Sequence, residues 1–224
     1  MTLSARRTQQ QRTEESSRRL AAAAIELIAE KGYAATTAVE IGERAGYSRS
    51  LVSVRFGGKD ALISYAFQTH QDTRIKPTFS DDETGLNRAI TRLSMVLRAF
   101  HAEPQAIRAM FIVNFEAVRG DEGLRKHVRQ WLHHFREGLT EDILIGQSDG
   151  SIDSSLDAQE IAREINATGV GYAYAWLVDP EGFNFDIEVT NWLERIAAQL
   201  QAGVSSPVGG LANPNTVKNI SQRV

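Results

Sequence analysis

The sequence predicts an all-α protein of about nine helices, and three observations support this fold class. Five prolines in 224 residues leave room for long helices. No stretch shows the sustained two-residue alternation that is typical of a half-buried strand. Apolar residues instead recur at intervals of three and four, the spacing of one helix face, most regularly in the series Leu86, Ile90, Leu93, Leu97 and Phe100.

The composition predicts a soluble, globular protein of the cytoplasm. Hydrophobic residues make up 42% and charged residues 24%, which is ordinary for a folded domain. The chain has no cysteine, which removes disulfides, thiol catalysis and thiolate metal sites. The polar, basic N-terminus does not have the apolar core of a secretion signal. The longest apolar run, residues 169–178, is about half of the ~20 residues that a membrane helix needs.

The first predicted helix spans residues 13–31 and ends at Gly32, because glycine commonly terminates helices. Helical spacing predicts its buried side, which consists of Leu20, Ala21, Ala24, Ile25, Leu27 and Ile28. Residues 1–12 are predicted to form a flexible basic arm. Within this arm, Arg6 and Arg7 either enter a DNA minor groove or have no role.

Two short helices joined by a tight turn are predicted next. Thr37 and Glu40 have the spacing of a capping box, and Gly46 ends the first helix. Ser48 is the expected N-cap of the second helix, which ends at Gly57-Gly58. The residues expected to face inward are Val39, Ile41, Ala45, Leu51, Val52, Val54 and Phe56, and those expected to face outward are Arg49, Ser50 and Ser53. This arrangement is that of a helix-turn-helix, whose second helix enters the major groove of DNA.

The charge is unevenly distributed along the chain. Residues 1–62 carry ten Lys and Arg against seven Asp and Glu, whereas the whole chain has a net charge of −3. The remaining residues therefore carry a net charge of −6. A basic N-terminal domain suits a phosphate-binding surface. By itself so mild an asymmetry is better explained by a solvated helical surface, so the charge only supports the motif.

Six further helices are predicted beyond Gly58 from the apolar spacing, from prolines and from turn-rich runs. Five of them cover residues 59–74, 86–100, 104–120, 157–179 and 189–200. The sixth is a long helix that begins at the cap Asp121 and ends at the turn-rich sequence QSDGS at 147–151. Val118 is expected on the apolar side of the helix at 104–120. Residues 203–224, rich in Gly, Pro, Ser and Asn, are predicted to be a flexible tail. The predicted division is an arm at 1–12, a helix-turn-helix domain at 13–58, a larger helical domain at 59–202 and the tail.

The order of residues in the N-terminal third is specific. A helix ends in glycine, a threonine pair and an Ile-small step follow, and an Ala-Gly turn leads to a Ser-capped helix that ends in Phe before a Lys-acidic-x-Leu element. The residues concerned are Gly32, Thr36-Thr37, Ile41-Gly42, Ala45-Gly46, Ser48, Phe56 and Lys59-Asp60-Ala61-Leu62. This order resembles the TetR family of transcriptional regulators. The resemblance covers residues 13–201, and it is weaker in the second half, where it consists of DGSID at 149–153, the helix opening at Asp157 and the Trp176-Leu177-x-x-Pro180 ending.

The motif and the resemblance together imply which residues contact DNA: Thr36, Thr37, Ala38, Ser48, Arg49, Ser50, Leu51, Ser53, Arg55 and Lys59. Arg49 is expected at a base edge, while Arg55 and Lys59, late in the helix or just beyond it, are expected at backbone phosphates. Ser53 stands where the family usually has a phosphate-contacting Tyr. Leu51 replaces a common Thr but keeps a side chain that can contact a thymine methyl group.

The resemblance also implies an inducer pocket in the larger domain. Its candidates are polar or large residues on apolar helix faces, for each of which core packing or surface exposure is the alternative: Met95, His101, Met110, Phe111, Asn114, Phe115, His127, Trp131, Asn166, Tyr172 and Trp176. The last two long helices are expected to pair with those of a second copy. The expected interface residues are Ile161, Ile165, Tyr172, Trp176, Trp192, Leu193, Ile196 and Leu200.

We therefore expect a ligand-responsive repressor that binds a palindromic operator as a homodimer and that a small-molecule inducer releases. Two alternatives remain open, a constitutive or architectural DNA-binding protein without an inducer and, in a different class, an all-α carrier or enzyme. No catalytic residues are expected, because the chain lacks a nucleophile elbow, a glycine-rich phosphate loop and a zinc-binding His-Glu-x-x-His helix. No cofactor and no metal site are expected either. The protein is expected to act at the nucleoid and not at a membrane.

Overall fold

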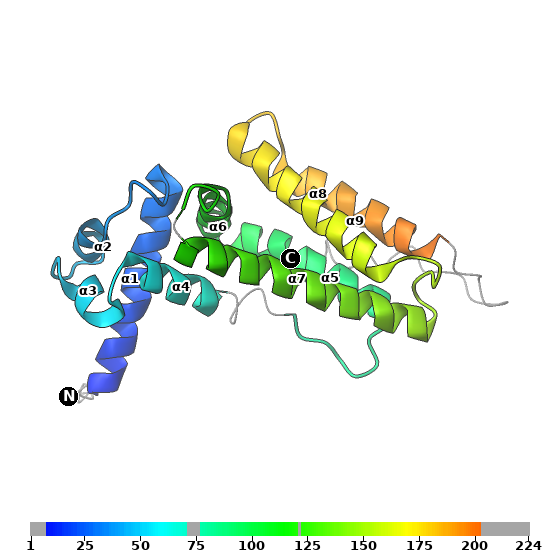
Figure 1. Ribbon diagram of the computed structural model, residues 1–224, viewed down its shortest axis with the longest axis horizontal. Coiled ribbons are helices and arrows are strands. Elements are labelled where there is room, and N and C mark those ends of the chain that lie inside the picture. Colours follow the sequence, from blue (N-terminus) through cyan, green and yellow to red (C-terminus); the bar gives the residue numbers. More distant parts are fainter. Residues whose placement is uncertain (1–7, 71–76, 121, 203–224) are drawn as a thin grey trace, which may run out of the picture. The chain divides into compact units, whose positions relative to one another are not determined.

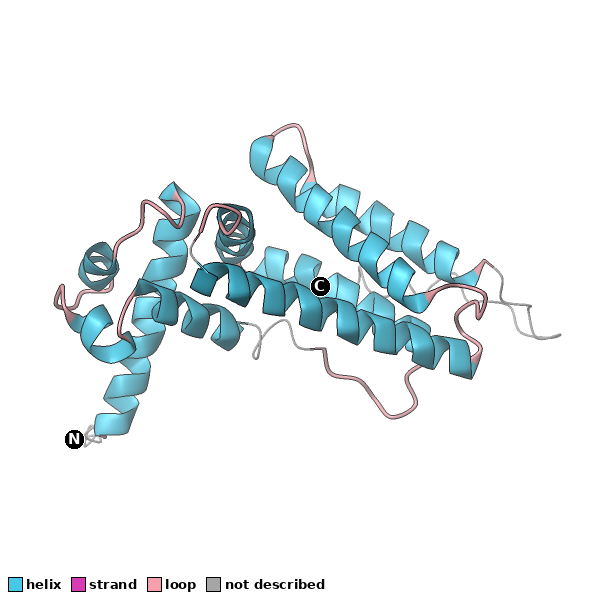
Figure 2. Ribbon diagram, in the orientation of Figure 1, coloured by secondary structure: helices cyan, strands magenta, loops and turns pink. Residues whose placement is uncertain are grey.

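Every regular element in the described part of the chain is a helix. The computed structural model describes residues 8–70, 77–120 and 122–202. Its helices, which Figure 1 labels, are α1 (Gln9–Lys31), α2 (Ala38–Arg44), α3 (Leu51–Phe56), α4 (Lys59–His70), α5 (Gly85–Ala102), α6 (Pro104–Glu116), α7 (Glu122–Asp149), α8 (Ala158–Val178) and α9 (Phe185–Gln201). Figure 2 shows that loops and turns make up the remainder of these residues. The predicted all-α fold class is confirmed.

Helix α1 begins four residues earlier than predicted. The Thr8 side chain accepts a hydrogen bond from the backbone N–H of Gln11, and the Gln11 side chain accepts one from the backbone N–H of Thr8, which is a complete capping box. Part of the predicted arm, residues 9–12, is therefore helical, and residues 1–7 lie outside the described residues. The predicted buried side of α1 is confirmed in full, and the helix ends at Gly32 with φ of 88°.

The helices form two compact units. The first contains α1 to α4, α6 and the beginning of α7 up to Val128. Within it, α1 packs against α2, α4 and α6, and α3 packs against both α2 and α4. Fully buried aliphatic side chains at its centre include Leu20, Ile28, Ile41 and Leu62. These contacts hold the helix-turn-helix on α1. The predicted domain boundary at residue 58 divides the chain by function and not by compactness, so it stays a prediction.

The second unit contains α5, the rest of α7, α8 and α9. Helix α9 packs against α5 and α8. The DGSID run joins two of its helices, because Asp149 and Ser151 accept hydrogen bonds from the first backbone N–H groups of α5, at Gly85 (2.7 Å) and Leu86 (3.1 Å). Burial opposes ionisation of Asp149, but the hydrogen bonds from Ser151 and Gly85 outweigh it and lower the pKa of this carboxyl.

An ion pair is buried between α5 and α7 in the second unit. The carboxylate of Asp142 is fully buried and lies 2.6 Å from Nε of Arg92 and 3.4 Å from Nε of Arg88. Both guanidinium groups also lie over the ring of Phe79. A buried charge requires such partners, and removing one partner of a buried pair typically costs about 3–5 kcal/mol.

The structure confirms the predicted start of α8 and corrects the predicted orientation of Val118. Asp157 caps α8 as expected, since its side chain accepts from the N–H groups of Gln159 and Glu160. Val118 is exposed and not on an apolar face, because α6 ends at Glu116. The predicted end of α4 at residue 74, the cap at Asp121 and the tail at 203–224 lie outside the described residues. None of the described helices has the length and apolar character that crossing a bilayer requires.

Candidate DNA-binding surface

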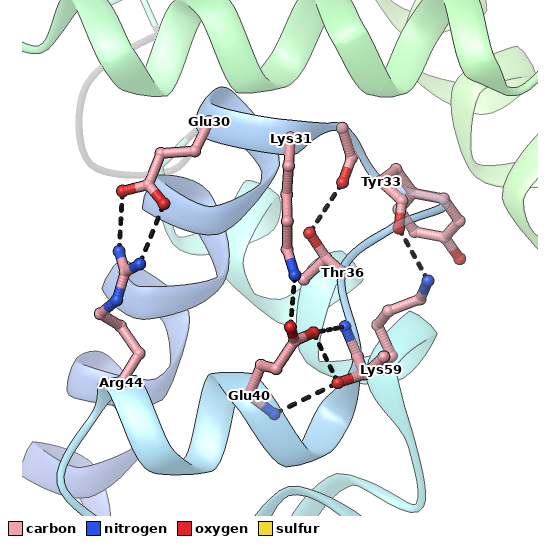
Figure 3. A network of polar contacts seen from close by, with 9 residues as sticks. Glu30, Lys31, Tyr33, Thr36, Glu40, Arg44 and Lys59 are labelled. Carbon is pink, nitrogen blue, oxygen red and sulfur yellow. Dashed lines mark hydrogen bonds and ion pairs between the residues drawn. The ribbon is translucent and has the colours of Figure 1, made fainter.

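The start of α2 is fixed by the capping box predicted from the sequence. The backbone N–H of Glu40 donates to Thr37 Oγ1 at 3.2 Å, and the N–H of Thr37 donates to Glu40 Oε2 at 3.0 Å. Lys31, the last residue of α1, lies 2.5 Å from the other carboxylate oxygen (Figure 3). Hydrogen bonds from Lys31 and then Thr37 lower the pKa of Glu40 to about 2. The Glu40 carboxylate thus joins α2 to the end of α1.

The end of α2 is held on α1 by a second ion pair. Two guanidinium nitrogens of Arg44 lie 2.8 and 2.9 Å from the two carboxylate oxygens of Glu30, a bidentate pairing (Figure 3). The hydrogen bond from Arg44 lowers the pKa of Glu30, and the same hydrogen bond to Glu30 raises the pKa of Arg44. Helix α2 is therefore tied to α1 at both ends.

The turn between α2 and α3 is a glycine-terminated helix end. Gly46 has φ of 77°, its N–H donates to the carbonyl of Glu43, and the N–H of Tyr47 donates to the carbonyl of Gly42. This pattern is a Schellman motif. Gly42 must be small, because a Cβ there would lie 2.7 Å from the carbonyl oxygen of Ser48. The close approach sets the position of the residues that precede α3.

The predicted N-cap of α3 is wrong by two residues. Helix α3 begins at Leu51, its N-cap position is Ser50, and no side chain caps it. The N–H of Leu51 donates to the carbonyl of Ser48 at 3.1 Å, so residues 48–51 form a separate turn. Ser48 is exposed and its Oγ lies 3.5 Å from that of Ser50. Its side chain is therefore open to solvent instead of closing the helix.

The structure also corrects two predicted orientations. Val54 is 78% exposed and Val39 is also exposed, although both were expected to face inward. Ile41 and Val52 are fully buried as predicted. Helices α2 and α3 are so short that their few apolar residues satisfy more than one helical register, and packing against α1 and α4 decides between them.

The outer face of α3 carries the predicted base-contacting region. Ser50, Ser53 and Val54 are exposed along it. Arg49, in the turn before the helix, has a side chain that is 76% exposed and whose Nε lies 2.6 Å from Glu43 Oε1. A surface ion pair of this kind contributes little stability and is easily exchanged for another partner. Arg49 is thus accessible, as predicted.

Arg55 and Lys59 are half-buried and hydrogen-bond to other parts of the protein. Arg55 Nη1 donates to the backbone carbonyl of Thr13 at 2.9 Å and to the hydroxyl of Ser16 on α1. Lys59 Nζ donates to the carbonyl of Tyr33 at 2.8 Å and lies 4.0 Å from the centre of the Tyr33 ring (Figure 3). Both side chains hold helices together within the protomer, and phosphate contacts by them stay predictions.

Thr36 is a correction to the predicted DNA contacts. Its side chain is 1% exposed, and its hydroxyl donates to the carbonyl of Gly32 at 2.7 Å (Figure 3). A side chain so enclosed cannot reach a phosphate. The neighbouring Thr37 and Ala38 are at the surface where α2 begins, so phosphate contacts by their backbone remain predicted.

A residue that sequence reasoning missed holds the segment between α1 and α2. Glu116, at the end of α6, accepts hydrogen bonds from the backbone N–H groups of Tyr33 at 3.1 Å and Ala34 at 2.7 Å. Gly32 leaves room for this carboxylate, since a Cβ there would collide with it. Arg108 of α6 also donates to the carbonyl of Ala29. Nothing near Glu116 in the sequence indicates a partner 83 residues away.

Comparison with known proteins identifies this arrangement. Residues 20–66 match the family model described as bacterial regulatory proteins, tetR family. A putative TetR-family transcriptional regulator from Rhodococcus sp. has the same fold, with a TM-score of 0.71 and 19% identity over 85% of this chain and 100% of that one. Residues 20–66 are therefore similar to the TetR family, and the likeness over the whole chain is one of fold. None of the curated proteins matches it significantly.

Two further solved structures agree with this fold over most of the chain. The fatty acid degradation regulator FadR from Bacillus halodurans has a TM-score of 0.68 at 16% identity, covering 81% of this chain and 94% of its own. The complex of SmeT with triclosan has a TM-score of 0.65 at 19% identity, covering 89% and 98%. The TetR-type match thus covers residues 20–66, and the solved structures extend the likeness in fold over most of the chain. At these identities the likeness establishes the fold, while ligand and operator are separate questions.

The predicted inducer-pocket residues are divided between the two units of the chain. Met110, Phe111, Asn114, Phe115 and His127 lie in the first unit, and Met95, His101, Trp131, Asn166, Tyr172 and Trp176 lie in the second. The amide of Asn114 donates to the carbonyl of Met110 on its own helix, at 3.0 Å. His101 pairs with Asp186 at 2.8 Å. Burial lowers the pKa of His127, which stacks on Phe67. Their role in binding an inducer stays a prediction.

Most of the predicted dimer-interface residues are buried within the single chain. Ile161, Ile165, Trp176, Trp192, Leu193, Ile196 and Leu200 are all buried within the protomer, and Tyr172, which is half-buried, accepts a hydrogen bond from Arg195 at 2.8 Å. These side chains form the core between α8, α9 and α5. Trp176, for example, contacts Phe100 and Phe185. Their role in an interface with a second copy stays a prediction.

Proposed function

We propose that this protein is a ligand-responsive transcriptional repressor that binds a palindromic operator as a homodimer and is released from it by a small-molecule inducer. The observation that carries the proposal is the division of the helix-turn-helix into two sides. One side is bonded to α1 through Glu40, Arg44 and Arg55. The other presents Arg49 and the outer face of α3 to solvent, as a helix that enters the major groove must.

The homodimer is supported by an exposed face on α8 and α9. Along α8, the exposed residues Ala167, Gly171, Tyr174 and Val178 recur at intervals of four, three and four, and on α9 Ile187 is exposed. Small and apolar residues at this spacing form a stripe on which a second helix pair can pack closely. In a two-fold dimer the same stripe of each copy meets the other. We infer that this α8 stripe, Ala167 to Val178, belongs to the interface together with the residues predicted from the sequence.

Dimerisation sets how the operator is recognised. A two-fold protein reads a palindrome, and its two copies of α3 must be about 34–36 Å apart to enter successive major grooves. An inducer that binds better to a form with a different separation shifts the population away from the DNA-bound form. By reciprocity, operator DNA must weaken inducer binding by the same factor. We propose α4, which follows the helix-turn-helix directly, as the coupling element.

Small-molecule release is supported by the triclosan complex of SmeT, a protein of similar fold. The test has two stages. Duplexes bound by the purified protein are selected from a random pool, and the expected product is a palindrome whose binding weakens steeply with salt. Apolar and aromatic compounds, triclosan among them, are then screened for release of that duplex, and release by at least one class is expected.

Each stage of this experiment separates the proposal from an alternative. A protein that selects no palindrome even in dilute buffer is not an operator-binding regulator. A protein that selects a palindrome but keeps it at every compound and concentration is a constitutive DNA-binding protein. Reporter expression from a promoter that contains the selected palindrome decides the sign of regulation, and lower expression in the presence of the protein is expected.

A further inference from the structure

The six residues of α3 divide into an inner and an outer face with different chemistry. Val52 is fully buried, and Arg55, three residues later, is bonded to α1. Ser53 and Val54 lie on the exposed side, next to the exposed Ser50 that precedes the helix. Two of these three carry hydroxyl groups. Val54 is the single apolar side chain that the helix presents fully to solvent, because Leu51 and Phe56 are half-buried.

Neither packing nor helix propensity explains valine at position 54. At 78% exposure its side chain contributes little to the core. A β-branched residue on the open side of a short helix is also less favourable than alanine, because its χ1 freedom is restricted. Valine at position 54 therefore makes the free protein slightly less stable than alanine would. Its exposed apolar side chain points to a partner on the outer side of α3.

The chemistry of the major groove limits what an apolar side chain can recognise. Valine neither donates nor accepts hydrogen bonds, so it cannot distinguish the polar base edges that arginine or serine can. The apolar feature in that groove is the C5-methyl group of thymine. Leu51 was the sequence-based candidate for such a contact, but its side chain is partly enclosed while that of Val54 is open.

We propose that Val54 is a specificity-determining residue that packs against a thymine methyl group in each half of the operator. The proposal rests on the DNA-binding function proposed above and adds to it one base preference and the side chain that produces it. Removing the methyl group from one half-site is expected to weaken binding by about fourfold, the value of one buried carbon. Removing the methyl group from both half-sites is expected to weaken binding by about 15-fold, because the free-energy losses at two distant sites add.

The test uses deoxyuridine, which differs from thymidine by the absence of this methyl group alone. Each thymine of the selected operator is replaced in turn, symmetrically in both halves, and the affinity of the full-length protein is measured by fluorescence anisotropy. Val54→Ala is measured on the same duplexes. Val118→Ala is the matched control, since Val118 is also 78% exposed and lies outside the helix-turn-helix. Val54→Thr keeps one methyl group and the branched shape.

The expected result is one thymine position at which deoxyuridine weakens the wild type and Val118→Ala equally but leaves Val54→Ala unchanged. Val54→Thr should retain most of the sensitivity. The proposal is overturned if no thymine position is sensitive, or if Val54→Ala loses as much affinity as the wild type at the sensitive position, which would assign the methyl contact to another side chain such as Leu51. Either outcome leaves a selected palindrome in place, so it is distinguishable from failure of the proposed function.

Discussion

The basic side chains around α3 differ in what they contact within the protomer. Arg55 and Lys59 each donate to a backbone carbonyl, whereas Arg49 is exposed and paired with a surface glutamate. Ser16 and Ser17 are buried on α1 where the Arg55 guanidinium reaches it. Arg55 thus adds a charged hydrogen-bond donor to a hydroxyl, that of Ser16, which itself donates to backbone carbonyls of α1. The same residue type, arginine, has different expected roles at positions 49 and 55.

Arg55→Ala is expected to lower stability by about 1–3 kcal/mol, because buried hydroxyls lose a charged partner, and to weaken operator binding by displacing α3. The dependence of log K on log salt should keep its slope, since an intramolecular arginine does not release a counterion on binding. A phosphate contact would instead reduce the slope by about 0.9 for each copy of the residue. Urea unfolding and a salt titration of operator binding measure the two effects, and a reduced slope with unchanged stability would support the phosphate contact predicted from the sequence.

Arg49→Ala is expected to cost about 1–3 kcal/mol of binding free energy on the selected operator. On an operator in which the base pair that Arg49 contacts is changed, wild type and variant should bind with nearly equal affinity. The physical reason is that arginine can bond two acceptors of guanine at once, so its contribution depends on the base. Arg18→Ala is a suitable control, because Arg18 is also exposed and paired with a glutamate on its own helix. Affinities for all single-base variants of the operator provide the measurement. A uniform loss across every variant would assign Arg49 to the phosphate backbone.

At the scale of helices, capping residues and helix-ending glycines predicted the bounds of helices, whereas apolar spacing did not reliably predict the buried face of a short helix. The capping box at Thr37, the stop at Gly32 and the cap at Asp157 were all read from local residues and are confirmed. The faces of α2 and α3 were partly wrong, because fewer than two turns do not define a helical period. Val54 was assigned to the core for that reason, and only packing against neighbouring helices reveals its exposure.

Gly32→Ala is expected to destabilise the first unit more than Gly46→Ala does. Both glycines have positive φ, but the backbone of Gly32 (φ 88°, ψ 164°) is accessible essentially to glycine alone, and a Cβ there would collide with Glu116. At Gly46 a Cβ meets nothing within 4 Å. Thermal unfolding of the two variants provides the comparison. Adding Glu116→Ala to Gly32→Ala should cost little more, because the collision has already displaced the carboxylate; full additivity would show that Glu116 does not depend on Gly32.

The junction of α1 and α2 is expected to weaken in acid. The pKa of Glu40 is lowered from 4.5 to about 2 in the folded protein, so the unfolded state binds a proton first as the pH falls. Its contribution to stability is therefore complete above about pH 4.5 and is lost as the pH falls toward 2. Glu40→Gln keeps a capping side chain but removes the charge. The difference in Tm between wild type and variant should shrink between pH 5 and about 2, and a constant difference would exclude the charge as the cause.

At the scale of the whole molecule, the sequence could predict helices but not their distant partners. The carboxylate of Glu116 is 82 residues from the N–H group of Ala34, and Arg55 is 42 residues from the Thr13 carbonyl, so no local pattern connects them. The dimer-interface residues stay a prediction for a related reason. Large apolar side chains on α8 and α9 satisfied the pattern, but those side chains also fill the protomer core, in contrast to the residues that remain exposed.

This distinction leads to a prediction about the assembly. Gly171 lies in the exposed α8 stripe, and a Cβ there would meet nothing within 4 Å in the protomer. Gly171→Arg is therefore expected to leave the protomer folded, with a gain of up to about 1 kcal/mol in helix propensity, while placing two charged side chains where the copies meet. Val118→Arg, at an exposed site outside α8 and α9, is the control.

For the wild type and the control, Tm should rise with protein concentration, because unfolding of a dimer also separates its subunits. For Gly171→Arg it should be independent of concentration, the mass by light scattering should be that of one chain, and operator binding should weaken because the two half-sites are no longer bound together. A Gly171→Arg protein that remains dimeric would place the interface elsewhere on the surface, even if wild-type binding to a palindrome were already established. A monomeric variant that still bound the palindrome at wild-type affinity would instead separate dimerisation from DNA recognition.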